Sequence, residues 1–345
     1  MLSEFRAKTT NWVAILLLVL AACAIAGAQA QQDQQDQKTD QLPTFTSNVN
    51  VVNLFFNVKD KHGNLIPSLT KSDFQVLEDG KPQTIKYFSA ESNQPLTLGI
   101  LIDTSGSQER VLPMEKEVGA SFLQNVLRPK DMAFLISFDV DVDELHDFTS
   151  DAGALRRAMD KAVINTGGAS GGIPGIGQGP IPQSQVPRGT LLYDAVYLAS
   201  HDKLSQEVGR KAMILLTDGE DQGSQLKMRD AIEAAQKSDS IIYVLLIADR
   251  GFYGLMGYSG ESDMKKMTAE TGGRVIEVGN KMDKLREAFD QIAQELRSQY
   301  NIGYTPTNTA RDGGFRKIEI KVATNKDFKI QARNGYYAPK ERSGD

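Results

Sequence analysis

The sequence of 345 residues contains a single cysteine, Cys23, and only three histidines, His62, His146 and His201. Cys23 lies in an apolar segment near the N-terminus, so the rest of the chain cannot form an internal disulfide. The histidines are far apart in the sequence, and only folding could bring them together. The formal net charge is −5, so nothing indicates an electrostatic attraction to nucleic acid.

The sequence also lacks the motifs of a phosphate-binding loop and of an EF-hand calcium site. The Gly-rich stretch "GGASGGIPGIG" lacks the Lys-Ser/Thr ending of a phosphate-binding loop. The acidic segment "DVDVDELHDFTS" has Glu144 at its sixth position and Ser150 at its twelfth, where an EF-hand has glycine and glutamate. Apolar residues alternate with the acids in this segment, which instead favours a strand with a solvated acidic face, at an antiparallel edge of a sheet.

Residues 1–30 have the pattern of a signal peptide. Basic residues precede the apolar run "WVAILLLVLAACAIAGA", and small residues follow it. The run is about 15–17 residues long, shorter than the roughly 20 of a membrane-spanning helix. The stretch "LAAC" resembles a bacterial lipobox, which would leave Cys23 lipidated, whereas cleavage after Ala28 or Ala30 is the alternative that we favour. Both predict export, to the periplasm, the cell surface or the medium, with membrane contact only through a lipid anchor at Cys23.

The rest of the chain divides by composition and by hydrophobic period. Residues 31–47 are rich in Gln and Asp and predict a disordered linker. Between residues 94 and 298, buried apolar runs alternate with amphipathic helical patterns, which is typical of an α/β fold with a doubly wound, mostly parallel sheet. The expected strands are 98–102, 132–138, 212–217, 241–247 and 274–278, and the expected helices are 109–127, 151–163, 190–206, 226–238, 261–272 and 281–298.

Two shorter β segments flank the α/β region. Residues 48–93 and 299–339 each contain too few strands to bury two faces, and a tail, 340–345, follows. We therefore expect the α/β domain to be inserted in one smaller β-sandwich-like domain. The alternative is a pair of small sheets that pack separately on the α/β domain. Within the first segment, "EDGK" indicates a tight hairpin.

Small oxygen-bearing side chains follow two of the expected core strands. In "LGILIDTSGS", Asp103, Ser105 and Ser107 occupy alternate positions just past the apolar run, and Asp218 follows another strand in "LLTDGED". Thr190 begins "GTLLYDA" after a long Gly/Pro-rich loop, 165–189. Ligands bind at the carboxyl ends of the strands in such sheets. Two carboxylates and three hydroxyls suit a hard divalent cation, Mg²⁺ first, with Mn²⁺ or Ca²⁺ as alternatives.

These five residues, in this order, resemble the metal-ion-dependent adhesion site of von Willebrand factor type A domains. The resemblance covers most of residues 48–339, and the flanking β segments resemble von Willebrand-related exported proteins first described from acidobacteria. It implies a non-enzymatic protein that captures an Asp or Glu carboxylate of a partner protein through the cation. The long loop before Thr190 departs from the pattern. The alternatives are a metal-assisted hydrolase, for which no general base or second metal site is evident, and an envelope protein with a stabilising metal.

Overall fold

The computed structural model describes residues 51–90, 94–165, 189–247 and 260–341. The predicted signal peptide with Cys23, the predicted linker and nearly all of the Gly/Pro-rich loop lie outside the described residues. Within the described ranges, no helix is both long and apolar enough to cross a membrane.

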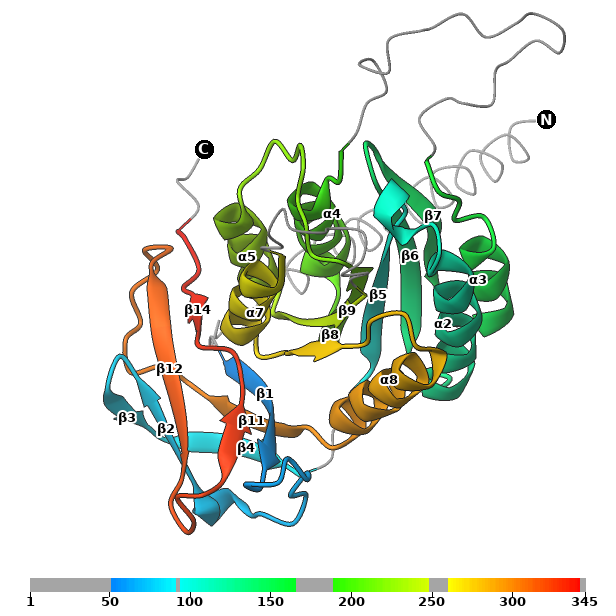
Figure 1. Ribbon diagram of the computed structural model, residues 1–345. Coiled ribbons are helices and arrows are strands. Elements are labelled where there is room, and N and C mark those ends of the chain that lie inside the picture. Colours follow the sequence, from blue (N-terminus) through cyan, green and yellow to red (C-terminus); the bar gives the residue numbers. More distant parts are fainter. Residues whose placement is uncertain (1–50, 91–93, 166–188, 248–259, 342–345) are drawn as a thin grey trace, which may run out of the picture. The chain divides into compact units, whose positions relative to one another are not determined.

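A six-stranded sheet forms the centre of the α/β region (Figure 1). Its strand order is β10-β9-β8-β5-β6-β7, and every strand is parallel to its neighbours except β7, which pairs antiparallel with β6 at one edge. The predicted fold class is therefore confirmed, including the antiparallel edge. The bounds are β5 (Leu96–Asp103), β6 (Met132–Phe138), β7 (Val142–Thr149), β8 (Arg210–Thr217), β9 (Ser240–Leu246) and β10 (Val275–Glu277).

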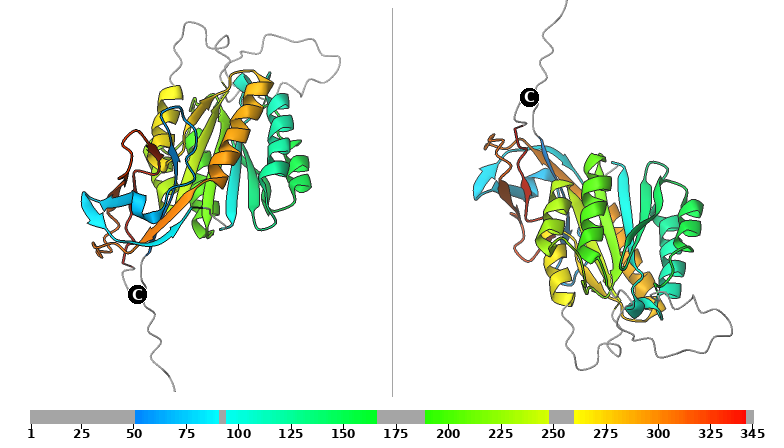
Figure 2. Two further views of the ribbon diagram at one scale, coloured as in Figure 1. Left: turned by 90° about the horizontal axis from the view of Figure 1, so that it is seen from below. Right: turned by 90° about the horizontal axis from the view of Figure 1, so that it is seen from above.

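Helices cover both faces of this sheet, and each face has its own apolar core (Figure 2). Strand β5 is buried along its whole length, and its side chains alternate between the two cores because successive residues of a strand point to opposite faces. Leu98 and Ile100 contribute to one core, and Leu101 contributes to the other. The first core is covered by α2 (Leu112–Val126), α3 (Ala152–Met159) and α8 (Met282–Arg297), and the second by α4 (Leu192–Leu198), α5 (Met228–Lys237) and α7 (Gly260–Thr271).

The two flanking β segments combine into two four-stranded sheets with one shared core. Each sheet contains strands from before and after the α/β region, so the alternative of two separate small sheets is wrong. Phe56 of one sheet and Phe74 of the other meet edge to face, with ring centroids 5.2 Å apart. The first sheet has the order β13 (Lys329–Gln331), β1 (Val52–Lys59), β11 (Tyr300–Tyr304), β4 (Ile85–Ser89), and the second β14 (Gly335–Tyr337), β12 (Phe315–Val322), β2 (Phe74–Glu78), β3 (Lys81–Gln83).

The hairpin at "EDGK" is present, but the strand that follows it is divided. Asp79 and Gly80 form the turn with φ of 49° and 77°, the left-handed conformation that this tight turn requires. The chain then leaves the second sheet after Gln83 and enters the first sheet at Ile85. Strands that cross from one sheet to the other are typical of sandwich corners. The hairpin signal gives no indication of this division, because the residues before and after Thr84 alternate in the same way.

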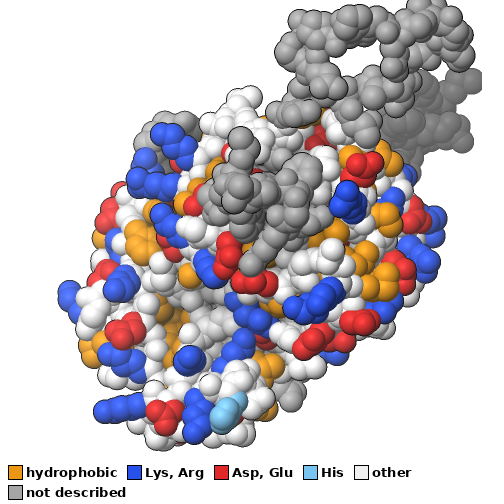
Figure 3. Space-filling model, viewed as in Figure 1, with side chains coloured by type: hydrophobic (Ala, Val, Ile, Leu, Met, Phe, Trp, Pro, Cys, Tyr) orange, Lys and Arg blue, Asp and Glu red, His pale blue; other side chains and the backbone are white. Residues whose placement is uncertain are grey.

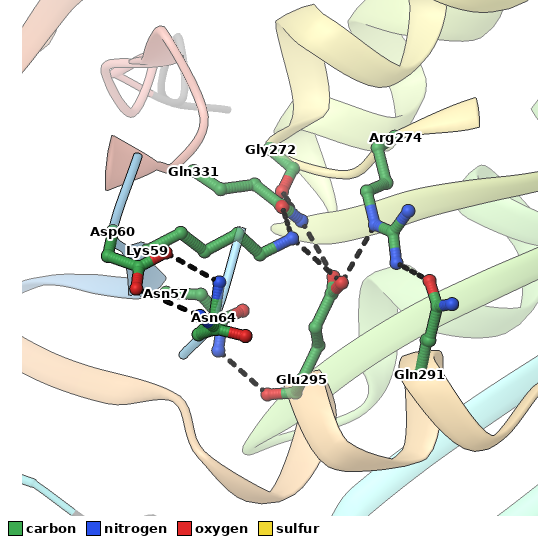
Figure 4. A network of polar contacts seen from close by, with 9 residues as sticks. All are labelled: Asn57, Lys59, Asp60, Asn64, Gly272, Arg274, Gln291, Glu295 and Gln331. Atoms are coloured by element: carbon green, nitrogen blue, oxygen red, sulfur yellow. Dashed lines mark hydrogen bonds and ion pairs between the residues drawn. The ribbon is translucent and has the colours of Figure 1, made fainter. Parts of the chain in front are cut away.

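A buried ion-pair network joins the first β sheet to helix α8 (Figure 4). The carboxylate of Glu295 accepts hydrogen bonds from Lys59 Nζ at 2.8 Å, Arg274 Nε at 2.7 Å and Gln331 Nε2 at 3.1 Å. The side-chain amide of Asn57 donates to the backbone carbonyl of Glu295 at 2.9 Å. Residues Asn50–Asp345 accordingly form one compact unit.

Candidate metal site

The site lies where the strand order of the central sheet reverses. From β5 the chain continues outward to β6 and β7, whereas from β8 it continues in the other direction to β9 and β10. The two strands are adjacent and parallel, with Ile102 opposite Leu216. Asp103 ends β5, and Asp218 directly follows β8. Loops that leave such a switch point diverge to opposite sides and leave a crevice at the strand ends, which is where doubly wound folds bind ligands.

Hydrogen bonds connect four of the five predicted ligands directly. The backbone N–H of Ser105 donates to Asp103 Oδ1 at 2.9 Å, as in an Asx turn. The hydroxyls of Ser105 and Ser107 share a hydrogen bond of 3.0 Å. The Ser107 hydroxyl donates to Asp218 Oδ2 at 2.5 Å, so the segment after β5 meets the segment after β8. The structure therefore brings these four side chains together at one edge of the sheet.

Thr190 is attached to the same region through its backbone. It forms isolated β-bridges with Gln222 and Gly223 in the loop that follows Asp218, with two backbone hydrogen bonds of 3.0 Å to Gln222. A side chain at Gly189 would place its Cβ 2.9 Å from the Gln222 carbonyl oxygen, so the close approach of the two segments favours glycine there. The N-cap of α4 is Leu191, so the helix expected over 190–206 begins at Leu192 and Thr190 lies before it.

Both carboxylates of the site are buried. Asp103 is fully buried and Asp218 is 2% exposed. Burial, and then the neighbouring charge of Asp218, raise the pKa of Asp103 to about 7, although hydrogen bonds from Ser105 and Thr217 act in the opposite direction. Because two close carboxylates share a site with little water, the site has an excess of negative charge that a bound cation would compensate.

Two residues that hold the carboxylates were not predicted from the sequence. The hydroxyl of Thr217 donates to Asp103 Oδ2 at 2.7 Å, and the buried amide of Gln108 donates to Asp218 Oδ2 at 3.1 Å. Each is adjacent in the sequence to a predicted ligand, and each is a polar residue at a position that the structure buries. The sequence could have indicated both residues, because each is a polar residue at or just after the end of an apolar strand. Their partners could not be assigned without the strand order.

The donor set fits a hard divalent cation better than a zinc cluster. Its atoms are carboxylate and hydroxyl oxygens, and the three histidines, all of which are described, are not among them. Over the part of the chain that the structure describes, no group of three or more His, Cys, Asp or Glu side chains has the arrangement of a metal cluster. A cation held by Asp103 and Asp218 would therefore depend on serine hydroxyls and water for its remaining ligands, as Mg²⁺ commonly does.

Comparisons with known proteins find similarity to the fold of part of the chain. No protein-family model matches the sequence, and no curated protein matches it. The conserved hypothetical protein BatB from Bacteroides thetaiotaomicron is similar over 58% of this chain and 97% of its own, at 19% identity and a TM-score of 0.42.

Two further solved structures are similar at lower identity. The von Willebrand factor domain of the type V pilus tip protein Mfa5 from Porphyromonas gingivalis is 15% identical over 59% of this chain and 95% of its own, with a TM-score of 0.42. Proximal thread matrix protein 1 from the mussel byssus, with a zinc-occupied MIDAS motif, is 15% identical over 62% of this chain and 48% of its own, with a TM-score of 0.45. All three TM-scores are below 0.5, so the functional conclusions rest on the site's residues.

Proposed function

We propose that this chain is an exported protein of the von Willebrand factor A type that binds another protein through a divalent cation. Asp103, Ser105, Ser107, Thr190 and Asp218 are the proposed ligands, some of them through water. The observation that carries the proposal is the convergence of two buried carboxylates and two serine hydroxyls at adjacent strand ends. Their chemistry is that of an oxygen site for Mg²⁺ or Mn²⁺.

The arrangement favours capture of a ligand over bond cleavage. When bound, the cation supplies a Lewis-acidic position for one more oxygen ligand. The chain contributes two carboxylates and otherwise neutral hydroxyls, so a carboxylate of an Asp or Glu side chain from a partner suits that position. Ser107 is partly exposed, whereas Asp103 is not, so the hydroxyl side of the site is the one that faces a partner. Charged side chains of both signs are interspersed on the face of the molecule drawn in Figure 3.

Export belongs to the same proposal. The N-terminal signal pattern predicts a periplasmic, surface-bound or secreted protein, and a lipid anchor at Cys23 is the alternative to a free N-terminus. Intact-mass analysis of protein from the native host separates these cases. We expect a mature chain that begins between Cys23 and Gln31, and an unprocessed N-terminus would contradict export.

Affinity capture tests the binding function. The mature protein is immobilised and exposed to extracellular and envelope proteins of the native host, once in Mg²⁺ and once with a chelator, with Asp103→Ala as the matched control. We expect a retained protein that is lost both in chelator and with Asp103→Ala. If the wild-type protein binds the cation but the same partner proteins are captured under all three conditions, metal-dependent adhesion is contradicted. The cation would then only stabilise the fold.

A further inference from the structure

A third acidic side chain, Glu115, lies buried near the two carboxylates of the site. It belongs to the first turns of α2, the helix that follows the "DTSGS" segment, and it is 0% exposed. Neither of its carboxylate oxygens has a hydrogen-bond partner among the described residues. A buried carboxylate without a donor is costly, because it loses its hydration and gains nothing in return.

The groups that act electrostatically on Glu115 are all acidic. Burial, and then the charges of Asp103 and Asp218, raise the pKa of Glu115 well above its usual range. Within the described ranges, no basic side chain contributes to this shift. Glu115 thus shares its electrostatic surroundings with Asp103 and Asp218, and the described residues place no basic side chain among the groups that act on it.

Gln108, which lies beside Ser107 and Asp218, provides a further buried oxygen without a partner among the described residues. Its side chain is fully buried, and its Nε2 is used by Asp218 and Ser107, but its Oε1 has no hydrogen-bond partner among the described residues. The unpartnered atoms of Gln108 and Glu115 are all oxygens, which accept hydrogen bonds or face cations. Their common requirement is a donor or a positive charge, and a hydrated cation provides both.

We propose that Glu115 ionises when a cation binds, supplies a third negative charge to the cation site and so raises its affinity for divalent ions, without being a direct ligand. The inference rests on the proposed function, since it assigns a further residue to the same site. Direct ligation is not part of it, because the three carboxyl groups do not form a metal cluster among the described residues. Glu115 would act on the cation at a distance, by electrostatic attraction and by accepting hydrogen bonds from water bound to the cation.

The consequence for a partner follows from the charge balance. Two carboxylates neutralise a divalent ion, and a third makes the site retain the ion even before a partner arrives. A partner's carboxylate would then bind mainly because it fills a free ligand position of the cation, and its negative charge would matter less. Glu115 therefore favours a site that stays loaded at low cation concentration.

Titration calorimetry of the mature protein with MgCl₂ tests this role through Glu115→Gln, which keeps the shape of the side chain and removes its charge. We expect Mg²⁺ affinity to fall by about tenfold or more, since a divalent ion loses a nearby charge in a site of low effective dielectric. Glu115→Asp, which keeps the charge, should retain most of the affinity. The matched control is Glu117→Gln on the same helix, where the side chain is 62% exposed and pairs with Arg286 at 3.1 Å, and it should leave the affinity unchanged.

Stability in the presence of chelator is the second measurement. Because Glu115→Gln removes one of three mutually repelling buried groups, the metal-free variant should unfold at the same urea concentration as wild type or a higher one. Unchanged Mg²⁺ affinity in Glu115→Gln would overturn the inference and leave Glu115 as a buried neutral acid. Absence of Mg²⁺ binding in wild type would instead overturn the proposed function.

Discussion

Glu115 and Glu295 are both buried in neighbouring helices of one layer, and their surroundings are opposite. Helices α2 and α8 pack against the same core, where Phe122 and Phe289 stack with ring centroids 4.5 Å apart. Glu295 is 2% exposed, and Lys59, Arg274 and Gln331 donate to its carboxylate (Figure 4). Glu115 is 0% exposed, and the charged groups that act on it among the described residues are two acids, Asp103 and Asp218.

The two glutamates differ in whether a basic side chain of the described residues pairs with them: Glu295 has such partners, whereas Glu115 does not. At Glu295 the positive charges come from the β sandwich and from the segment before β10, so the ion pairs fasten two parts of one compact unit together. At the ends of β5 and β8 two carboxylates meet, and the charges that act on the nearby Glu115 among the described residues are those of these same two acids. Buried acids gathered at a switch point are what the proposed cation site is built on.

Removing an acid from the proposed cation site should have the largest effect on cation binding. Asp103→Ala should abolish detectable Mg²⁺ binding, because it removes half of the direct carboxylate charge. The metal-free fold should survive, since the substitution relieves repulsion with Asp218. Titration calorimetry and circular dichroism measure the two properties. Unchanged affinity in a folded Asp103→Ala protein would refute the site.

The pH dependence of stability should be the next largest difference between the two regions. The pKa of Asp103 is raised to about 7 in the folded, metal-free protein, from about 4 in an unfolded chain. The stability that its protonation contributes is complete below the lower value and is lost as the pH rises through the higher one. Glu115 is shifted in the same direction and adds to this loss.

Urea unfolding in chelator between pH 5 and 8 measures the effect. We expect the midpoint to fall as the pH rises, and saturating Mg²⁺ to reduce the fall because a cation holds the carboxylates ionised. The carboxyl groups of Asp60, Asp73, Asp147 and Asp312, whose pKa values are lowered, titrate below this window. A midpoint that stays constant from pH 5 to 8 would contradict a buried pair of neighbouring carboxyl groups.

Removing the charge of Glu295 should lower the stability of the fold without changing cation binding. Glu295→Gln leaves Lys59 and Arg274 without their counter-charge, and we expect a loss of about 2 kcal/mol in the free energy of unfolding. This is below the value for a fully buried pair, because the two side chains are 16% and 28% exposed and water screens them. Mg²⁺ affinity should not change. A weaker Mg²⁺ affinity in Glu295→Gln would show that the two regions are coupled.

The smallest effect is expected at a neutral ligand. Ser107→Ala should weaken Mg²⁺ binding less than Asp103→Ala, since water replaces a hydroxyl at an entropic cost of about 0–2 kcal/mol. Ser107 also donates to Asp218, so some of the loss comes from a less fixed carboxylate. Calorimetry on both variants under one set of conditions gives the ranking, and a larger loss in Ser107→Ala would reverse it.

The α/β part of the fold could be predicted from sequence because its strands are continuous apolar runs separated by amphipathic helices. Strand β5, "LTLGILID", is buried at every position, and its apolar character ends where the site begins. The convergence of Asp103 and Asp218 followed from the rule that parallel strands present their carboxyl ends at one edge. The adjacency of β5 and β8 itself required the structure.

Other features depended on contacts between distant segments. The crossing of the chain between the sheets at Thr84 has no local signal, because the alternation of "KPQTIKYF" continues through it. Glu115 occupies a position on the buried face of α2, in register with Leu112 and Gly119, so an acid in an apolar stripe was a signal that helical spacing offered. Its relation to Asp218 could not be read from spacing. Thr190 was placed at a helix start, whereas the structure ties it to the loop after Asp218.

Anomalous diffraction from crystals of the mature protein grown with Mn²⁺ tests the central claim most directly. Mn²⁺ has the same preference for oxygen ligands as Mg²⁺ and is visible by its anomalous signal. The account predicts one peak within coordination distance of oxygens from Asp103, Ser105, Ser107 and Asp218, with Glu115 beyond direct ligand distance. Crystals saturated with Mn²⁺ that show no peak at the ends of β5 and β8 would contradict it.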